Sequence, residues 1–253
     1  MLLDRVSIKS EAKDIVKNAS VSAYLFTLLF LALSWLLAGM SDYVSLNEET
    51  VYNIYYATGV DLSFLVLHRA FPALLVTFIT ILAALLGVLL EIGYILYHLG
   101  IRRGREMPYL TLFDGFSFAG KVILLYIVQY IFIFLWSLLF IVPGIIAAYR
   151  YRLALYLLLD HPEMSAMDCI RESKRIMSGN KGQLFVLDLS FIGWWILAGI
   201  PIVGLFVRVW VVPYTQMTYA LYYTTLTGTN APGAIPGDGS AQDEPHEEHP
   251  WEN

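Results

Sequence analysis

Three charged side chains stand out because they lie within long apolar stretches of the sequence: Glu91, Arg150 and Arg152. A charge inside a bilayer is costly, so it usually faces a partner, a cavity or the interface. Arg150 and Arg152 are two residues apart and cannot share one helix face. We expect one arginine to reach the outer headgroups while the other points inward, toward Glu91 or a lipid phosphate. Alternatively, both arginines mark only a later start or a tilt of their helix, and Glu91 is an interfacial carboxylate.

The rest of the sequence offers little for catalysis. It contains no zinc-protease motif, phosphate loop, dinucleotide fingerprint or nucleophile elbow. Cys169 is the only cysteine, which excludes an intrachain disulfide and a cysteine-based metal cluster. His246 and His249 stand among carboxylates near the C-terminus and would bind a metal only weakly. We therefore predict no enzymatic activity, no cofactor and no metal site.

The composition is that of an integral membrane protein. Hydrophobic residues make up 58% of the 253 residues and charged residues 15%, whereas soluble domains average about 45–50% and about 25%. The formal net charge of −5 comes from residues 227–253, which carry six carboxylates and no Lys or Arg. This tail lacks hydrophobic periodicity and is predicted to be disordered. The charge pattern indicates no nucleic-acid partner.

The lengths of the apolar runs predict an all-α, polytopic transmembrane bundle of about six spans. Roughly 20 apolar residues cross a hydrocarbon core of about 30 Å. Residues 122–159 and 184–226 are too long for one crossing, so each should fold back as a helical hairpin. In the first run we place the turn at Pro143 and Gly144, because proline ends a helix and glycine tolerates a tight reversal. The turn of the second run is placed at Gly199, Pro201 and Gly204. The membrane domain is then residues 21–226, with predicted spans at 21–40, 70–97, 122–141, 145–159, 184–200 and 205–226.

Basic residues cluster in three segments that an even number of spans would place on one side. Cytoplasmic loops carry an excess of Lys and Arg, and the 41–70 loop between the first two spans has only Arg69. The three basic clusters are Arg5, Lys9, Lys13 and Lys17; Arg102, Arg103, Arg105 and Lys121; and Arg171, Lys174, Arg175 and Lys181. This pattern predicts a multi-pass protein of the cell membrane with both termini in the cytoplasm.

Two amphipathic helices are predicted at the cytoplasmic surface, within residues 1–20 and 165–178. The first has an apolar stripe (Ile8, Ala12, Ile15, Ala19) and a lysine face (Lys9, Lys13, Lys17). It should lie at the headgroup level, with a cytosolic extension of the first span as the alternative. The second has a cap pattern at Ser165 and Asp168 and a stop signal at Gly179, and it should pack under the bundle.

Several short motifs, taken in order, carry a family resemblance. They are FDGF at 113–116, LWSLLFIVPGII at 135–146, DHPE at 160–163, SKRIMSGNK at 173–181, LSFIGW at 189–194 and Pro213-Tyr214. The sequence resembles the bacterial integral-membrane family catalogued as domain of unknown function 975. It is more distantly similar to the membrane region attached to some glycerophosphodiester phosphodiesterases. The resemblance implies a membrane fold and location but no catalytic residues.

Two functional hypotheses follow. The first is a non-enzymatic accessory or organising component that contacts membrane lipids, another membrane protein or a second copy. The second is a small transporter or lipid-handling protein that uses Arg150 or Arg152 to contact an anionic substrate. An intramembrane enzyme ranks last. A polar cavity lined by one arginine and Glu91 would favour the second hypothesis, whereas arginines at lipid headgroups on a closely packed bundle would favour the first.

Overall fold

The computed structural model describes residues 5–45, 48–60, 72–200 and 203–229, and within these ranges the fold is all-α. The predicted turn residue Pro201, both tail histidines and most of the predicted disordered tail lie outside the described residues. The elements are α1 (Arg5–Asn18), α2 (Ala23–Ser45), α3 (Glu48–Thr58), α4 (Ala73–Arg102), the 3₁₀ segment η2 (Tyr109–Phe118), α5 (Ala119–Leu139), α6 (Ile141–Tyr151), α7 (Ala154–Asp160), α8 (Ala166–Ile176), α9 (Lys181–Leu189), α10 (Ile192–Ala198) and α11 (Val203–Thr227).

Among the residues that the structure describes, four helical segments are long and apolar enough to cross a membrane. They are Ala23–Ser45, Ala73–Arg102, Tyr109–Leu139 and Ile141–Asp160. The predicted span at 184–200 is divided between α9 and α10, and the one at 205–226 lies within the more polar α11. The all-α class predicted from the sequence therefore holds, with four candidate membrane spans, while the count of six spans stays a prediction.

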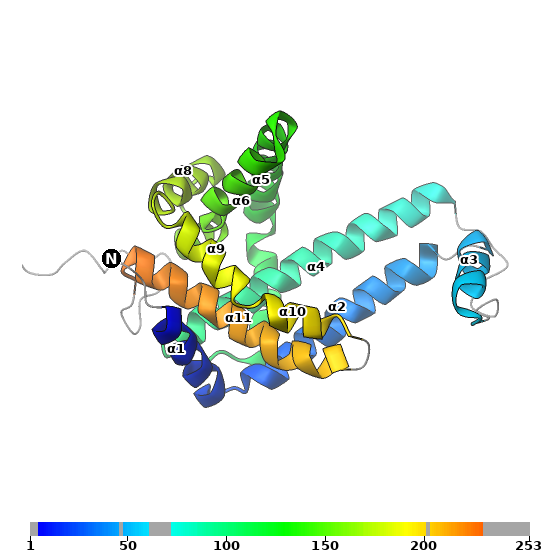
Figure 1. Ribbon diagram of the computed structural model, residues 1–253, viewed down its shortest axis with the longest axis horizontal. Coiled ribbons are helices and arrows are strands. Elements are labelled where there is room, and N and C mark those ends of the chain that lie inside the picture. Colours follow the sequence, from blue (N-terminus) through cyan, green and yellow to red (C-terminus); the bar gives the residue numbers. More distant parts are fainter. Residues whose placement is uncertain (1–4, 46–47, 61–71, 201–202, 230–253) are drawn as a thin grey trace, which may run out of the picture.

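The longer helices pack in pairs (Figure 1). The pairs meet one another at one end and point in different directions at the other. α2 and α4 pack side by side and project together toward α3. α5 and α6 pack together and project in another direction, and α10 packs on α11 as a third pair. Most of the buried hydrophobic core lies where the three pairs converge, and it includes Tyr97, Leu158 and Tyr222.

The long apolar run at 122–159 is interrupted, but earlier than the sequence indicates. α5 ends at Leu139, Phe140 is extended with φ −160° and ψ 153°, and α6 begins at Ile141 rather than near Ile145. Pro143 therefore lies in the first turn of α6, where a missing amide hydrogen costs nothing. Gly144 allows close packing, because a Cβ there would lie 2.0 Å from Ser137 Oγ.

A second close approach sets the angle of η2. A Cβ at Gly93 of α4 would lie 2.0 Å from the Leu112 carbonyl oxygen, and one at Gly115 would lie 2.1 Å from the Leu89 carbonyl oxygen. Only glycine tolerates such backbone contact at both positions. The two glycines thus let η2 lie directly on α4 before the chain turns into α5.

Both predicted amphipathic helices are present. α1 buries Ile8, Ala12 and Val16 and packs on α11, so it is a separate helix and not an extension of α2. In α8 the Ser165 hydroxyl accepts a hydrogen bond from the Asp168 amide at 3.2 Å. α8 ends at Ile176, three residues before Gly179, and Gly179 has φ +86°, a conformation that glycine adopts readily.

Candidate functional site

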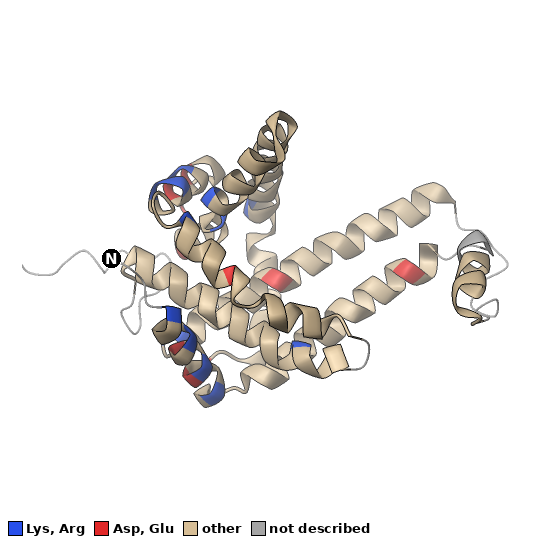
Figure 2. Cartoon of the chain, in the orientation of Figure 1, with Lys and Arg blue, Asp and Glu red and all other residues tan. Residues whose placement is uncertain are grey.

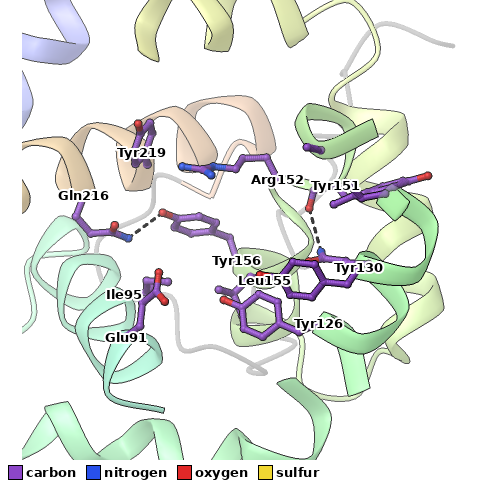
Figure 3. Close-up of a pocket in the computed structure, with 13 residues that line it drawn as sticks. Glu91, Ile95, Tyr126, Tyr130, Tyr151, Arg152, Leu155, Tyr156, Gln216 and Tyr219 are labelled. Carbon is purple, nitrogen blue, oxygen red and sulfur yellow. Dashed lines mark hydrogen bonds between the residues drawn. The ribbon is translucent and has the colours of Figure 1, made fainter. Parts of the chain in front are cut away.

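A cavity of about 220 Å³ lies between helices from separate parts of the chain (Figure 3). Its walls come from α4, α5, α6, α7 and α11, and they combine one guanidinium, one carboxylate, two amides and several tyrosines with apolar side chains. The lining residues are Glu91, Ile95, Tyr126, Gln129, Tyr130, Ile133, Ala148, Tyr151, Arg152, Leu155, Tyr156, Gln216 and Tyr219.

Arg152 stands at a break between α6 and α7, and side chains from other helices stabilise this break. The Ser173 hydroxyl of α8 donates to the Arg150 carbonyl at 2.9 Å and accepts from the Leu153 amide at 3.2 Å. The Gln129 amide of α5 donates to the Tyr151 carbonyl at 3.1 Å. Backbone groups freed inside a membrane must find such substitutes. Specific side-chain hydrogen bonds therefore stabilise the break, and the break directs Arg152 into the cavity.

Aromatic and acidic groups hold the Arg152 head in place. Its guanidinium carbon lies 5.1 Å from the Tyr219 ring centre, within the range of a cation–π interaction. The Tyr219 hydroxyl donates to one oxygen of Asp188, and the Tyr149 hydroxyl donates to the other, each at 2.8 Å. Asp188 thus orients Tyr219 and places negative charge behind the arginine.

Glu91 reaches the same cavity from α4. Glu91 and Arg152 are both exposed to the cavity, and they form no ion pair within 4.0 Å. Figure 3 shows Tyr156 between them, with its hydroxyl accepting a hydrogen bond from the Gln216 amide at 2.9 Å. Two opposite charges therefore face a shared space without neutralising each other directly.

The structure shows which of the two arginines faces the cavity, a question that the sequence left open. Arg152 lines the cavity, whereas Arg150 does not line it and is half-buried elsewhere. The sequence analysis missed the polar partners Gln129, Gln216 and Tyr219. The i, i+3 spacing of Gln216 and Tyr219 on one face of an apolar helix was the signal that could have found the last two.

A family model described as Protein of unknown function (DUF975) matches residues 1–154 and residues 138–230. The chain belongs to this family. The resemblance seen in the short motifs is thereby confirmed. No curated protein and no solved structure matches the chain.

This DUF975 protein has a second charged cluster, at the convergent ends of α4, α7 and α11. Arg103 Nη2 lies 2.6 Å from Asp160 Oδ2, and both side chains are only 4% exposed. The Tyr223 hydroxyl donates to the same carboxylate oxygen at 2.7 Å. The sequence analysis assigned Arg103 to a cytoplasmic loop, because the partner that buries it is 57 residues away.

Metal-binding geometry is not found in the part of the DUF975 chain that the structure describes. No group of three or more His, Cys, Asp or Glu side chains in those ranges could hold a metal ion. At the cavity, Glu91, Arg152, Gln216 and the tyrosines provide groups for charge recognition and hydrogen bonding.

Proposed function

We propose that this protein is a non-enzymatic, lipid-handling protein of the bacterial cell membrane that takes the polar headgroup of a lipid into the cavity. The observation that carries the proposal is the pair of Glu91 and Arg152, which face a common cavity between helices apolar enough to span a bilayer. Charges held at such a place normally have a functional partner. A bound headgroup would supply that partner.

The surroundings of the cavity support entry from the bilayer. Tyr130 lines the cavity and is also 68% exposed on α5. Its neighbours Ile127 and Ile131 are 52% and 51% exposed on the same helix. Apolar surface of this kind is suited to lipid acyl chains. A lipid could therefore lie along α5 while its headgroup occupies the cavity.

The clustering of helix ends supports a membrane orientation with six spans. Arg103, Asp160 and Tyr223 stand at the ends of the predicted second, fourth and sixth spans, and hydrogen bonds join them. Three span ends that share one cluster lie on one side of the membrane, as an even number of crossings requires. Figure 2 shows Lys and Arg concentrated on α1 and α8 and none on the projecting halves of α2 and α4. Such basic segments favour the cytoplasm.

The accessory role expected as the first hypothesis would fit a closely packed bundle with both arginines at the headgroup level. Arg150 is compatible with that role, but Arg152 is not, because it is directed into the cavity. The geometry therefore favours lipid handling over a purely organising role.

Native mass spectrometry of the detergent-purified protein tests the proposal. We expect wild type to retain a phospholipid, and the Arg152→Gln variant to retain at least about tenfold less. Arg150→Gln is the matched control, since it removes the same charge two residues earlier in the chain and outside the cavity. Equal retention by wild type and Arg152→Gln would overturn the proposal.

Reporter fusions test the orientation independently. Fusions at Glu106, Asn180 and the C-terminus should report a cytoplasmic location, and a fusion at Asn47 an external one. An external signal at Asn180 would refute the six-span arrangement.

A further inference from the structure

We infer that the cavity selects a zwitterionic phospholipid headgroup, with the phosphate at Arg152 and the ammonium group at Glu91. The inference rests on the proposed lipid-handling function and deepens it by naming the class of lipid. Its starting point is that Glu91 and Arg152 line one cavity without contacting each other.

The local charge balance disfavours a simple anion. Glu91 and Asp188 place two carboxylates near the single guanidinium of Arg152. An anionic headgroup would satisfy Arg152 but would bring a further negative charge to Glu91 in a site partly shielded from water. A zwitterion adds no net charge and gives each side chain a counter-charge. Complementarity to both groups therefore favours a headgroup that carries both signs.

The positions of the two charged side chains are fixed by different helices. Arg152 is held over the Tyr219 ring at 5.1 Å, while Glu91 projects from α4. The hydrogen-bonded pair of Tyr156 and Gln216 stands between them (Figure 3). This arrangement keeps the cavity from closing into a direct ion pair and leaves separate places for phosphate and ammonium.

Aromatic rings complete the end of the cavity that contains Glu91. Tyr126 and Tyr156 lie close enough to Glu91 to interact with its charge. Tyrosine faces beside a carboxylate are suited to an alkylammonium group, which is attracted by both. At the other end, a guanidinium is the usual partner of a phosphate oxygen.

The cavity has room for a small polar group. Its volume of about 220 Å³ compares with the roughly 10–15 Å³ that a site for one water needs on the same measure. The chains would have to remain outside, along the exposed apolar face of α5. A free phosphodiester with the same headgroup lacks these chains, so the proposal requires the lipid to bind more tightly than its water-soluble counterpart.

Titration of the delipidated full-length protein, followed by native mass spectrometry, tests this selectivity. The four ligands are phosphatidylethanolamine, phosphatidylglycerol, phosphatidylethanol and water-soluble glycerophosphoethanolamine. Phosphatidylethanol is the matched ligand, because it lacks the ammonium group but keeps the phosphate and the chains. We expect phosphatidylethanolamine to bind at least about tenfold more tightly than each of the other three.

Variants assign the selectivity to the two charges. In Glu91→Gln the preference for phosphatidylethanolamine over phosphatidylethanol should fall to within about twofold, and Glu91→Asp should restore part of it. Arg152→Gln should weaken the binding of all the phospholipids, and Arg150→Gln should bind them as wild type does. If Glu91→Gln does not fold, the comparison of the two matched lipids on wild type still decides the question.

The outcomes separate the inference from the proposed function. Equal binding of phosphatidylethanolamine and phosphatidylethanol, or a preference for phosphatidylglycerol, overturns the zwitterion inference if binding still depends on Arg152. Tighter binding of glycerophosphoethanolamine than of the lipid shows a soluble ligand and also overturns the inference. Absence of Arg152-dependent lipid binding removes the proposed function itself.

Discussion

The cavity and the convergent ends of the helices use the same three kinds of side chain in opposite ways. At the convergent ends, Arg103, Asp160 and Tyr223 contact one another and are almost completely buried. In the cavity, Arg152, Glu91 and the tyrosines surround open space, and the two opposite charges remain apart. The first arrangement pairs its two opposite charges directly with each other, whereas the second leaves them available to a ligand.

This difference separates a structural cluster from a binding site. Removing one partner of a buried ion pair leaves an uncompensated charge in a medium that solvates it poorly. A charge that faces a cavity has no such dependence on one protein partner. Substitutions in the convergent cluster should therefore lower the free energy of unfolding, whereas substitutions in the cavity should weaken ligand binding.

The largest effect is expected for Asp160→Asn, which leaves Arg103 buried without its counter-charge. We expect a loss of about 3–5 kcal/mol in the free energy of unfolding, measured by reversible unfolding in detergent. Glu172→Gln is the control, because it breaks the largely exposed pair of Arg175 and Glu172 and should cost far less, since water screens exposed pairs. Similar losses in both variants would contradict the assigned structural role.

The reactivity of Cys169 offers a second probe of the convergent region. Burial raises the pKa of this thiol to about 11, so the thiolate fraction at neutral pH should be roughly 100-fold lower than for an unburied cysteine. We expect maleimide labelling of Cys169 to be slower by at least about 100-fold than labelling of Glu106→Cys in a Cys169→Ala background. Comparable rates would show that the region opens readily in solution.

A smaller loss is expected for Tyr223→Phe, which removes one hydrogen bond to the buried carboxylate of Asp160. A hydrogen bond to a charged group is worth about 1.5–3 kcal/mol, and the unfolding assay should report a loss in this range. Tyr222→Phe is the matched control, since its hydroxyl donates to the neutral Asn180 carbonyl at 2.9 Å and should cost less. A larger loss in the control would show that the charge of the acceptor does not determine how much the hydrogen bond contributes to stability.

The smallest effect on stability is expected for Arg152→Gln, although this variant should lose lipid binding. The variant removes the contact with the Tyr219 ring and the attraction to Asp188 but breaks no direct ion pair, so the loss should be about 1 kcal/mol or less. The same unfolding assay measures it beside Asp160→Asn. A loss as large as that of Asp160→Asn would make Arg152 a structural residue and would erase the contrast between the two regions.

Features that depend on local sequence could be predicted. The helical class and the caps of α8 follow from hydrophobic run length and from the residue types at the helix ends. The interruption of the run at 122–159 was also predicted, but its position was not, because Pro143 fits within the first turn of α6 and the break falls at Phe140.

The break at Arg152 could not be predicted because the local sequence contains no proline or glycine that would cause it. It depends on the Ser173 hydroxyl and the Gln129 amide, which come from other helices and replace helical hydrogen bonds. The sequence could suggest that one of two arginines meets Glu91. It could not say which, because the answer depends on the direction that this break gives to each side chain.

Hydrophobic content and segment length, read from the sequence alone, determined the all-α class and the presence of helices long and apolar enough to span a membrane, because bilayer thickness sets a length that can be counted in residues. The tertiary structure decided which charges are joined and which face open space. Arg103 meets Asp160 and Arg152 shares a cavity with Glu91 only because helices distant in the sequence are brought together. Electrostatic pairing depends on distances in space, and those distances are fixed by packing between helices.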